Sequence, residues 1–322
     1  MKIKEKLREK LSEVSSLMIV VFVLLVEIIY FAVTNKYFFN INNFLNIGLY
    51  AAIIGCVSCS VTFINISGMI DISVGSQIAV AGMVSAVVLE KGLPWYVAVI
   101  GALVAGALCG AVNGFFVTKL KLNAFITTIA TMQIFRGVAY LLTNGMSLAI
   151  ADEQFKFIGR GYILGLPMSM LIMIVSFVIF HLISKYTVFG RNIYMIGGNA
   201  QASFLSGIKV NDIRFKLYLL NGFMSGLSGA LMSAQTGSGI PSAAASYNMT
   251  ALSAVILGGA ALTGGKGTIL GTFLGSMVLS ILTNGMTMNG MGAYWQEISI
   301  GLVLILAVSI DAIKGGSLKR KI

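Results

Sequence analysis

Residues 62–76 read TFINISGMIDISVGS, and they interrupt two long apolar runs that each have the length of a membrane-crossing helix, about 20 residues. The small and polar residues that make this interruption are Asn65, Ser67, Gly68, Asp71, Ser73 and Gly75. A carboxylate at membrane depth costs about 2.5–3.5 kcal/mol even on the lenient insertion scale. Irregular backbone persists at that depth only where protein buries it or water reaches it. The stretch therefore predicts a break between two membrane helices, centred on residues 65–75.

The composition of the whole chain agrees with a membrane protein. Of its 322 residues 57% are hydrophobic and 10% are charged, and the mean hydropathy is +0.92. A soluble domain carries about 25% charged residues, so a soluble enzyme, a disordered chain and a small disulfide-rich secreted module are excluded. Cys56, Cys59 and Cys109 lie in apolar runs without a second cysteine pair or a nearby histidine. They are predicted to be buried thiols, and no metal or other cofactor is expected.

The hydropathy pattern predicts an all-α, polytopic membrane bundle of about ten transmembrane helices. The eighth of these is short and rich in glycine. The expected spans are 17–34, 44–64, 72–90, 94–118, 123–143, 165–185, 213–236, 250–262, 267–286 and 293–313.

The positive charges predict the orientation of these spans. With the N-terminus in the cytoplasm, 17 of the 22 Lys and Arg residues fall in cytoplasmic segments, four fall outside and Arg136 falls within a span. Positive residues collect on the cytoplasmic side of membrane proteins. Residues 1–16 are therefore expected to be a cytoplasmic amphipathic segment, 17–313 one transmembrane domain and 314–322 a cytoplasmic basic tail. The distribution also explains the net charge of +11 without a nucleic-acid partner.

The break at 65–75 has two interpretations. It is either a gate or pathway element of the discontinuous kind found in transporters, or a cytoplasmic turn with a capping aspartate. In both, a helix opens from Ser73 onward and Asp71 lies near its N-cap, where free amides and the helix dipole favour an anion. Arg136, inside a span, is expected to form a structural ion pair in preference to a substrate contact.

A second glycine cluster, LGGAALTGGKG at 257–267, resembles a phosphate-binding loop but lacks its pattern. That pattern requires glycine at 260 and Ser or Thr at 267, where this chain has Ala260 and Gly267. We expect a tight turn at this position and no nucleotide site.

The segment 186–212 is the longest predicted cytoplasmic loop, and it is mostly uncharged. Asn199 is a suitable N-cap and Gly207 a suitable residue after a helix C-terminus, so Ala200–Ser206 is expected to form about two helical turns, entered sharply through Gly197 and Gly198. Phe204 and Leu205 make this helix apolar. It either docks onto a partner protein or packs back on its own bundle.

Several motifs, in order along the chain, resemble one family. They are SGMIDISVGS at 67–76, LNAFITTIATMQIFRGVAYLLTNG at 122–145, FGRNIYMIGGNAQASFLSGIKV at 189–210, AVILGGAALTGGKGTILGTFLG at 254–275 and YWQ at 294–296. The chain closely resembles the permease subunits of bacterial ATP-binding-cassette importers for simple sugars, the ribose, galactose and xylose permease group. The resemblance extends from about Phe38 to Asp311.

The resemblance implies a non-enzymatic transport subunit of the bacterial inner membrane, with both termini in the cytoplasm and a substrate path between two permease copies. It implies separate cytoplasmic ATP-binding domains, often fused in one chain, and an external sugar-binding protein. The residues expected to couple to the ATPase are Gly190, Arg191, Gly197, Gly198, Asn199, Phe204, Leu205 and Gly207. Nucleosides, branched-chain amino acids and a furanosyl signalling molecule are alternative cargoes, and a stand-alone ion-coupled transporter is an alternative class.

Overall fold

The computed structural model describes residues 2–314, which form thirteen α-helices and four two-residue strands. The helices are α1 (Lys2–Thr34), α2 (Ile41–Ile66), α3 (Val74–Glu90), α4 (Trp95–Thr118), α5 (Ala124–Leu141), α6 (Glu153–Arg160), α7 (Met168–Tyr186), α8 (Val188–Gly198), α9 (Ala200–Leu205), α10 (Val210–Thr236), α11 (Tyr247–Leu257), α12 (Ile269–Met288) and α13 (Ala293–Lys314). Strand β1 (Leu148–Ala149) pairs with β4 (Ser238–Gly239), and β2 (Tyr162–Ile163) pairs with β3 (Leu166–Pro167), both antiparallel.

The helical, polytopic architecture expected from the sequence is confirmed. Within the described residues, six helical stretches are long and apolar enough to cross a membrane. They are residues 17–34 of α1 and the whole of α2, α4, α5, α7 and α12. The 27-residue α10 is also long enough, but its serine, glycine and asparagine residues lower its hydropathy. The first helix runs without a break from Lys2, so the predicted boundary at residue 16 is not a break in secondary structure. The predicted tail at 314–322 lies, from 315 on, outside the described residues.

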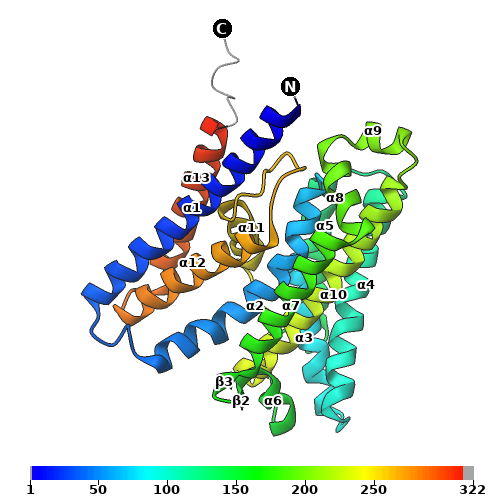
Figure 1. The fold of residues 1–322 in the computed structure, drawn as a ribbon. Helices are drawn as coiled ribbons and strands as arrows, with labels where there is room; N and C mark the ends of the chain where they lie inside the picture. Colours follow the sequence, from blue (N-terminus) through cyan, green and yellow to red (C-terminus); the bar gives the residue numbers. More distant parts are fainter. Residues whose placement is uncertain (1, 315–322) are drawn as a thin grey trace.

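The helices form two groups that lie side by side, and different elements lie at the two ends of the molecule (Figure 1). Helices α1, α12 and α13 lie on one side, and α3, α4, α5, α7 and α10 lie on the other. Helix α2 extends between the groups, and α11 lies in the space where they meet. The start of α1, the end of α13 and helices α8 and α9 lie at one end, called here the α9 end; α6 and the β2–β3 hairpin lie at the opposite α6 end.

Helix α10 packs against α4 through paired glycines. A Cβ atom on Gly106 would meet the backbone of Gly222 and Gly226, and one on Gly110 would meet the backbone of Tyr218 and Gly222. Small residues at such positions let two membrane helices approach until their backbones touch. The glycine repeats in the sequence therefore mark the tightest helix pair of the bundle.

The eighth predicted span, 250–262, is wrong. Helix α11 has 11 residues and is about 16 Å long, roughly half of the 30 Å of membrane hydrocarbon. The preceding residues 237–246 run beside α3, because Gly239 contacts Ala86 near one end of α3 and the carbonyl of Ala244 lies against Gly75 at the other. Residues 237–257, called here the re-entrant segment, are therefore a non-helical strip followed by a half-length helix.

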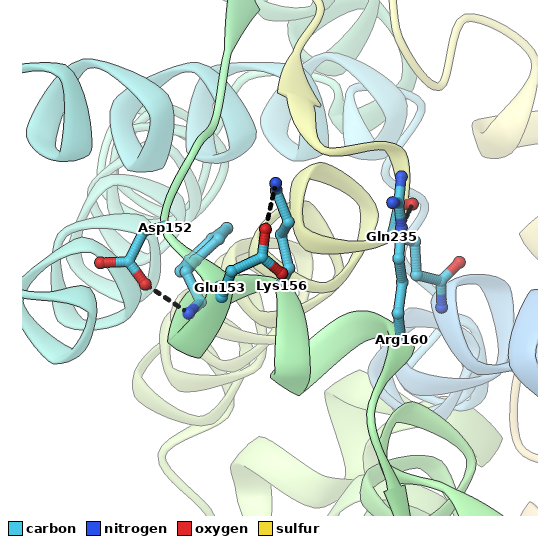
Figure 2. A network of polar contacts seen from close by, with 6 residues as sticks. Asp152, Glu153, Lys156, Arg160 and Gln235 are labelled. Carbon is cyan, nitrogen blue, oxygen red and sulfur yellow. Dashed lines mark hydrogen bonds and ion pairs between the residues drawn. The ribbon is translucent and has the colours of Figure 1, made fainter.

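The short helix α6 covers the far end of α10. The carboxylate of Asp152 accepts a hydrogen bond from the Phe155 amide at 2.8 Å and so caps α6, while Lys156 pairs with Glu153 at 2.9 Å (Figure 2). Arg160 donates from Nε to the carbonyl of Gln235 near the end of α10. These contacts fix the α6 end of α10, so the chain can turn there into the re-entrant segment.

Candidate functional site

The broken stretch of the sequence forms a buried turn between α2 and α3. Helix α2 ends at Ile66, and Gly68 takes a positive φ of +75°, a conformation that favours glycine. Helix α3 begins at Val74 with Ser73 as its N-cap. Between them Asp71 points inward and is 5% exposed. A carboxylate at such a position requires several hydrogen-bond donors.

Five donors surround the Asp71 carboxylate. Ser73 donates from its amide (2.9 Å) and its hydroxyl (2.6 Å), and Gln77 donates from Nε2 (3.0 Å). Asn221 of α10 donates from Nδ2 at 2.9 Å, and Asn113 of α4 donates from Nδ2 at 3.3 Å. Neither of the two ion pairs found among the described residues includes Asp71. This cluster, the Asp71 clamp, therefore ties the turn to α3, α4 and α10 with neutral donors, in charge-assisted hydrogen bonds that are stronger than neutral ones.

The residues proposed from the sequence for a pathway or gate are mostly enclosed here. Asn65, Ser67, Asp71 and Ser73 are each at most 5% exposed, and they line no open surface in this conformation. Asp71 is not itself the N-cap, since Ser73 takes that position and makes no side-chain capping bond. The Asp71 carboxylate instead accepts a hydrogen bond from the amide of Ser73, the residue just before the helix. The polar side chains of the turn thus belong to the interior, whereas Gly68 is exposed and, with Met69 and Ile70, lines a cavity of about 550 Å³. The role of the turn in transport stays a proposal.

The sequence analysis did not find the partners of Asp71 on other helices. Asn113 and Asn221 are both 0% exposed. Asn221 also accepts a hydrogen bond from the Ser60 hydroxyl of α2 at 2.8 Å, and Tyr218 donates to the Ile70 carbonyl at 2.8 Å. Amide side chains carry no charge, so the pattern of ionisable residues did not indicate Asn113 or Asn221. The signal that was present is an amide side chain inside an apolar span, which requires a polar partner as a charge does.

Three glycine-containing segments that are far apart in the sequence meet beside this turn. The amide of Gly265 donates to the carbonyl of Ile66, the last residue of α2, at 2.8 Å. A Cβ on Gly197 of α8 would strike that same carbonyl, and a Cβ on Gly264 would come within 2.8 Å of the Gly68 Cα. We call these four glycines, 68, 197, 264 and 265, the glycine junction. It joins the turn, α8 and the loop before α12, where the phosphate-loop-like sequence proves to be a packing element.

The predicted helix in the 186–212 loop is confirmed as α9. The Asn199 side chain accepts from the Ala202 amide at 2.9 Å, and Gly207 has a φ of +85°. Phe204 is 65% and Leu205 77% exposed, beside a groove of about 400 Å³ formed with the start of α10. An apolar surface of this kind at the α9 end is open to a partner.

Helix α8 precedes α9 and was not predicted. Thr187 caps it by accepting the Gly190 amide at 3.0 Å. A Cβ on Gly190 would collide with the backbone of Ser184, and Gly197 belongs to the glycine junction. Arg191 and Gly198 are exposed. Of the residues expected to couple, Gly190 and Gly197 therefore fix α8 against the bundle, while Arg191, Phe204 and Leu205 face outward.

Arg136 of α5 holds the re-entrant segment. Its Nη1 donates to the carbonyls of Pro241 and Ala243, both at 2.7 Å. The expected ion pair with a carboxylate is therefore wrong: neither ion pair of the described residues involves Arg136, and backbone carbonyls take the place of the acid. This arrangement satisfies non-helical carbonyls that lipid could not satisfy.

Comparison with known proteins places this architecture in a family. The family described as "Branched-chain amino acid transport system / permease component" matches residues 43–308. The chain belongs to this family of permeases. The match covers the turn, the Asp71 clamp, α9 and the re-entrant segment, so these features are parts of a transport protein.

Several relatives of this permease are named as permeases for sugars. The ribose import permease protein RbsC of Haemophilus influenzae is 35% identical over 292 residues, which cover 89% of this chain and 90% of that protein. The L-arabinose transport system permease protein AraH of Escherichia coli is 37% identical over 272 residues, 84% and 83% of the two chains. The L-arabinose ABC transporter permease protein AraH of Azospirillum brasilense is 30% identical over 292 residues, 91% and 86%. No solved structure is significantly similar.

Proposed function

We propose that this permease is the membrane subunit of an ATP-binding-cassette importer that carries a monosaccharide such as ribose or arabinose. The observation that carries the proposal is the similarity to ribose and arabinose permeases along nearly the whole length of both chains. An external binding protein delivers the sugar, a separate cytoplasmic ATPase drives the transport, and a second permease copy completes the path. The buried Asp71 clamp and the exposed α9 fit a subunit that receives force at one end.

The proposed orientation places the α9 end in the cytoplasm of a bacterium, with the protein in the inner membrane. The start of α1, the end of α13, α8 and α9 share that end (Figure 1). The segments expected inside hold 17 of the 22 Lys and Arg residues, as the positive-inside rule requires. In this orientation Phe204 and Leu205 of α9 face the ATPase. Apolar side chains that become buried when two proteins bind carry most of the energy of an interface.

The test is uptake of radiolabelled ribose and arabinose into proteoliposomes. These hold the permease with its co-purified ATPase and are supplied with an external sugar-binding protein. We expect sugar uptake that requires ATP. Uptake driven by an ion gradient without ATPase would contradict the proposal and identify a secondary transporter.

A branched-chain amino acid is the second candidate cargo, because the family description names that class. Labelled leucine tests it in the same vesicles. ATP-dependent leucine uptake with no sugar uptake would favour this candidate over the first.

A further inference from the structure

Gln133 is an exposed amide in the middle of a membrane helix. It is the tenth residue of the 18-residue α5, so it lies roughly 14 Å from each end of that helix. Its side chain is exposed, and it makes no hydrogen bond with any described residue. The exposed residues near the middle of α4 and α7, such as Leu108 and Val175, are apolar as lipid contact requires.

Ile126 and Ile129 on the same side of α5 are exposed and apolar, but Gln133 itself does not suit contact with lipid. Hydrocarbon offers an amide no hydrogen-bond partner, and side chains of this kind face a bundle interior or a water-filled cavity. Ala130 and Gly137, on the same face as Gln133, are also exposed, and a Cβ on Gly137 would meet nothing within 4 Å. The amide therefore has a small residue about one helical turn away on either side.

The neighbour of this face is the re-entrant segment. Arg136 binds two of its carbonyls, and the Asn248 amide lies 3.7 Å from the Met132 sulfur. Three residues along a helix correspond to a rotation of about 60°, so Gln133 lies next to the Arg136 edge of α5. The strip thus continues the surface that Gln133 begins.

The re-entrant segment also exposes one polar side chain. Ser242, Ala245 and Met249 are exposed, the last of them apolar, and the Ser242 hydroxyl makes no hydrogen bond with a described residue. Irregular backbone at membrane depth is tolerated where it lines a cavity. Two elements from different parts of the sequence therefore present unpartnered polar groups on adjoining surfaces.

We propose that α5 and the re-entrant segment form the wall of the substrate path, and that the Gln133 amide binds sugar hydroxyls midway across the membrane. An amide offers both a donor and an acceptor, which suits a hydroxyl that is also both. Arg136 holds the strip in place through its hydrogen bonds to the Pro241 and Ala243 carbonyls. This inference rests on the proposed function for the identity of the cargo, whereas the presence of water at the wall is independent of it.

Accessibility to a charged thiol reagent tests the wall. Gln133→Cys and the control Val175→Cys are made in the native chain, whose Cys56, Cys59 and Cys109 are buried. A membrane-impermeant thiosulfonate is supplied on both sides of proteoliposomes. We expect labelling of Cys at 133 at least tenfold faster than at 175, and slower labelling when ribose and ATP are present. Equal rates would overturn the proposal, as would a 133–133 disulfide formed with no labelling, because the face would then be a closed contact between two copies.

Transport by Gln133→Leu tests the contact with sugar. Loss of a hydrogen bond predicts a KM for uptake about tenfold higher, with ATPase activity retained and with wild-type uptake by the lipid-facing control Val175→Leu. A wild-type KM in Gln133→Leu would overturn the contact. If the native protein imports no sugar while the cysteine at 133 labels rapidly, the proposed function fails and the wall stands, so the two failures are distinguishable.

Discussion

A single methyl group on Gly197 should break the glycine junction, whereas the same methyl on Gly198 should not. A Cβ on Gly197 would overlap the Ile66 carbonyl, with the Ile66 carbonyl carbon at 2.9 Å, and would also strike the Gly265 amide. These are the two groups that hydrogen-bond to each other at 2.8 Å. A Cβ on Gly198 would meet nothing within 4 Å. The two glycines are neighbours in α8, so the pair isolates the junction from any general effect on the helix.

The expected cost of Gly197→Ala follows from these contacts. Overpacking by one methyl costs about 1–3 kcal/mol where neighbours are backbone atoms that cannot rotate away. Loss of the hydrogen bond between Gly265 and Ile66 adds about 0.5–1.5 kcal/mol. The total is about 1.5–4.5 kcal/mol of unfolding free energy. Gly198→Ala should be neutral or stabilise the helix by up to about 1 kcal/mol, because alanine restricts the unfolded chain.

Thermal unfolding in detergent and ATP-dependent uptake, measured on the same preparations, check this prediction. Gly197→Ala should unfold at a lower temperature and should transport less per inserted molecule than Gly198→Ala, which should match the native protein. If the two variants have the same unfolding temperature and the same uptake, the junction is not a close contact and the reasoning is refuted.

Three further predictions test other parts of the molecule. Asp71→Asn replaces an oxygen that accepts from amide side chains, so stability should fall by about 1–3 kcal/mol and uptake should fall with it; Asp152→Asn, a carboxylate at the α6 end, is the control, and equal effects would contradict the Asp71 clamp. Phe204→Asp should lose the co-purifying ATPase while the bundle stays inserted; retention of the ATPase with normal uptake would mean that α9 does not dock. Ala200→Cys and Lys156→Cys should label from opposite sides of intact cells, the first only from inside; the reverse would overturn the proposed orientation.

The sequence predicted those elements whose periodicity or capping is local. The apolar runs around α2 and α4 are long enough to identify the spans. Helix α9 was predicted to within one residue, because Asn199 and Gly207 act on the backbone of their own turn. The re-entrant segment was missed because the apolar residues of α11 favour a span, which was placed at 250–262, whereas the non-helical strip before α11 is positioned only by contacts such as that of Ala244 with Gly75.

The partners of Asp71 illustrate the limit for the candidate site. The distance from Asp71 to Asn221 is 150 residues along the chain and 2.9 Å in space. No local pattern connects them, because the glycine contacts between α4 and α10 set the depth at which Asn113 and Asn221 meet the turn. The sequence could identify Asp71 as unusual, but only helix packing determines which donors reach it.

Taken as a set of contacts, the site links its exposed end to its interior without a gap. Helix α9 follows α8 directly, α8 touches the end of α2 through Gly197, and Gly265 binds the same carbonyl of Ile66. The turn that begins at Ile66 carries Asp71, which binds α4 and α10. A displacement of α9 is resisted at each step by backbone contact or by a charge-assisted hydrogen bond, and neither yields as a flexible side chain would. The buried Asp71 carboxylate is therefore a joint between the segment that carries α9 and the helices α4 and α10.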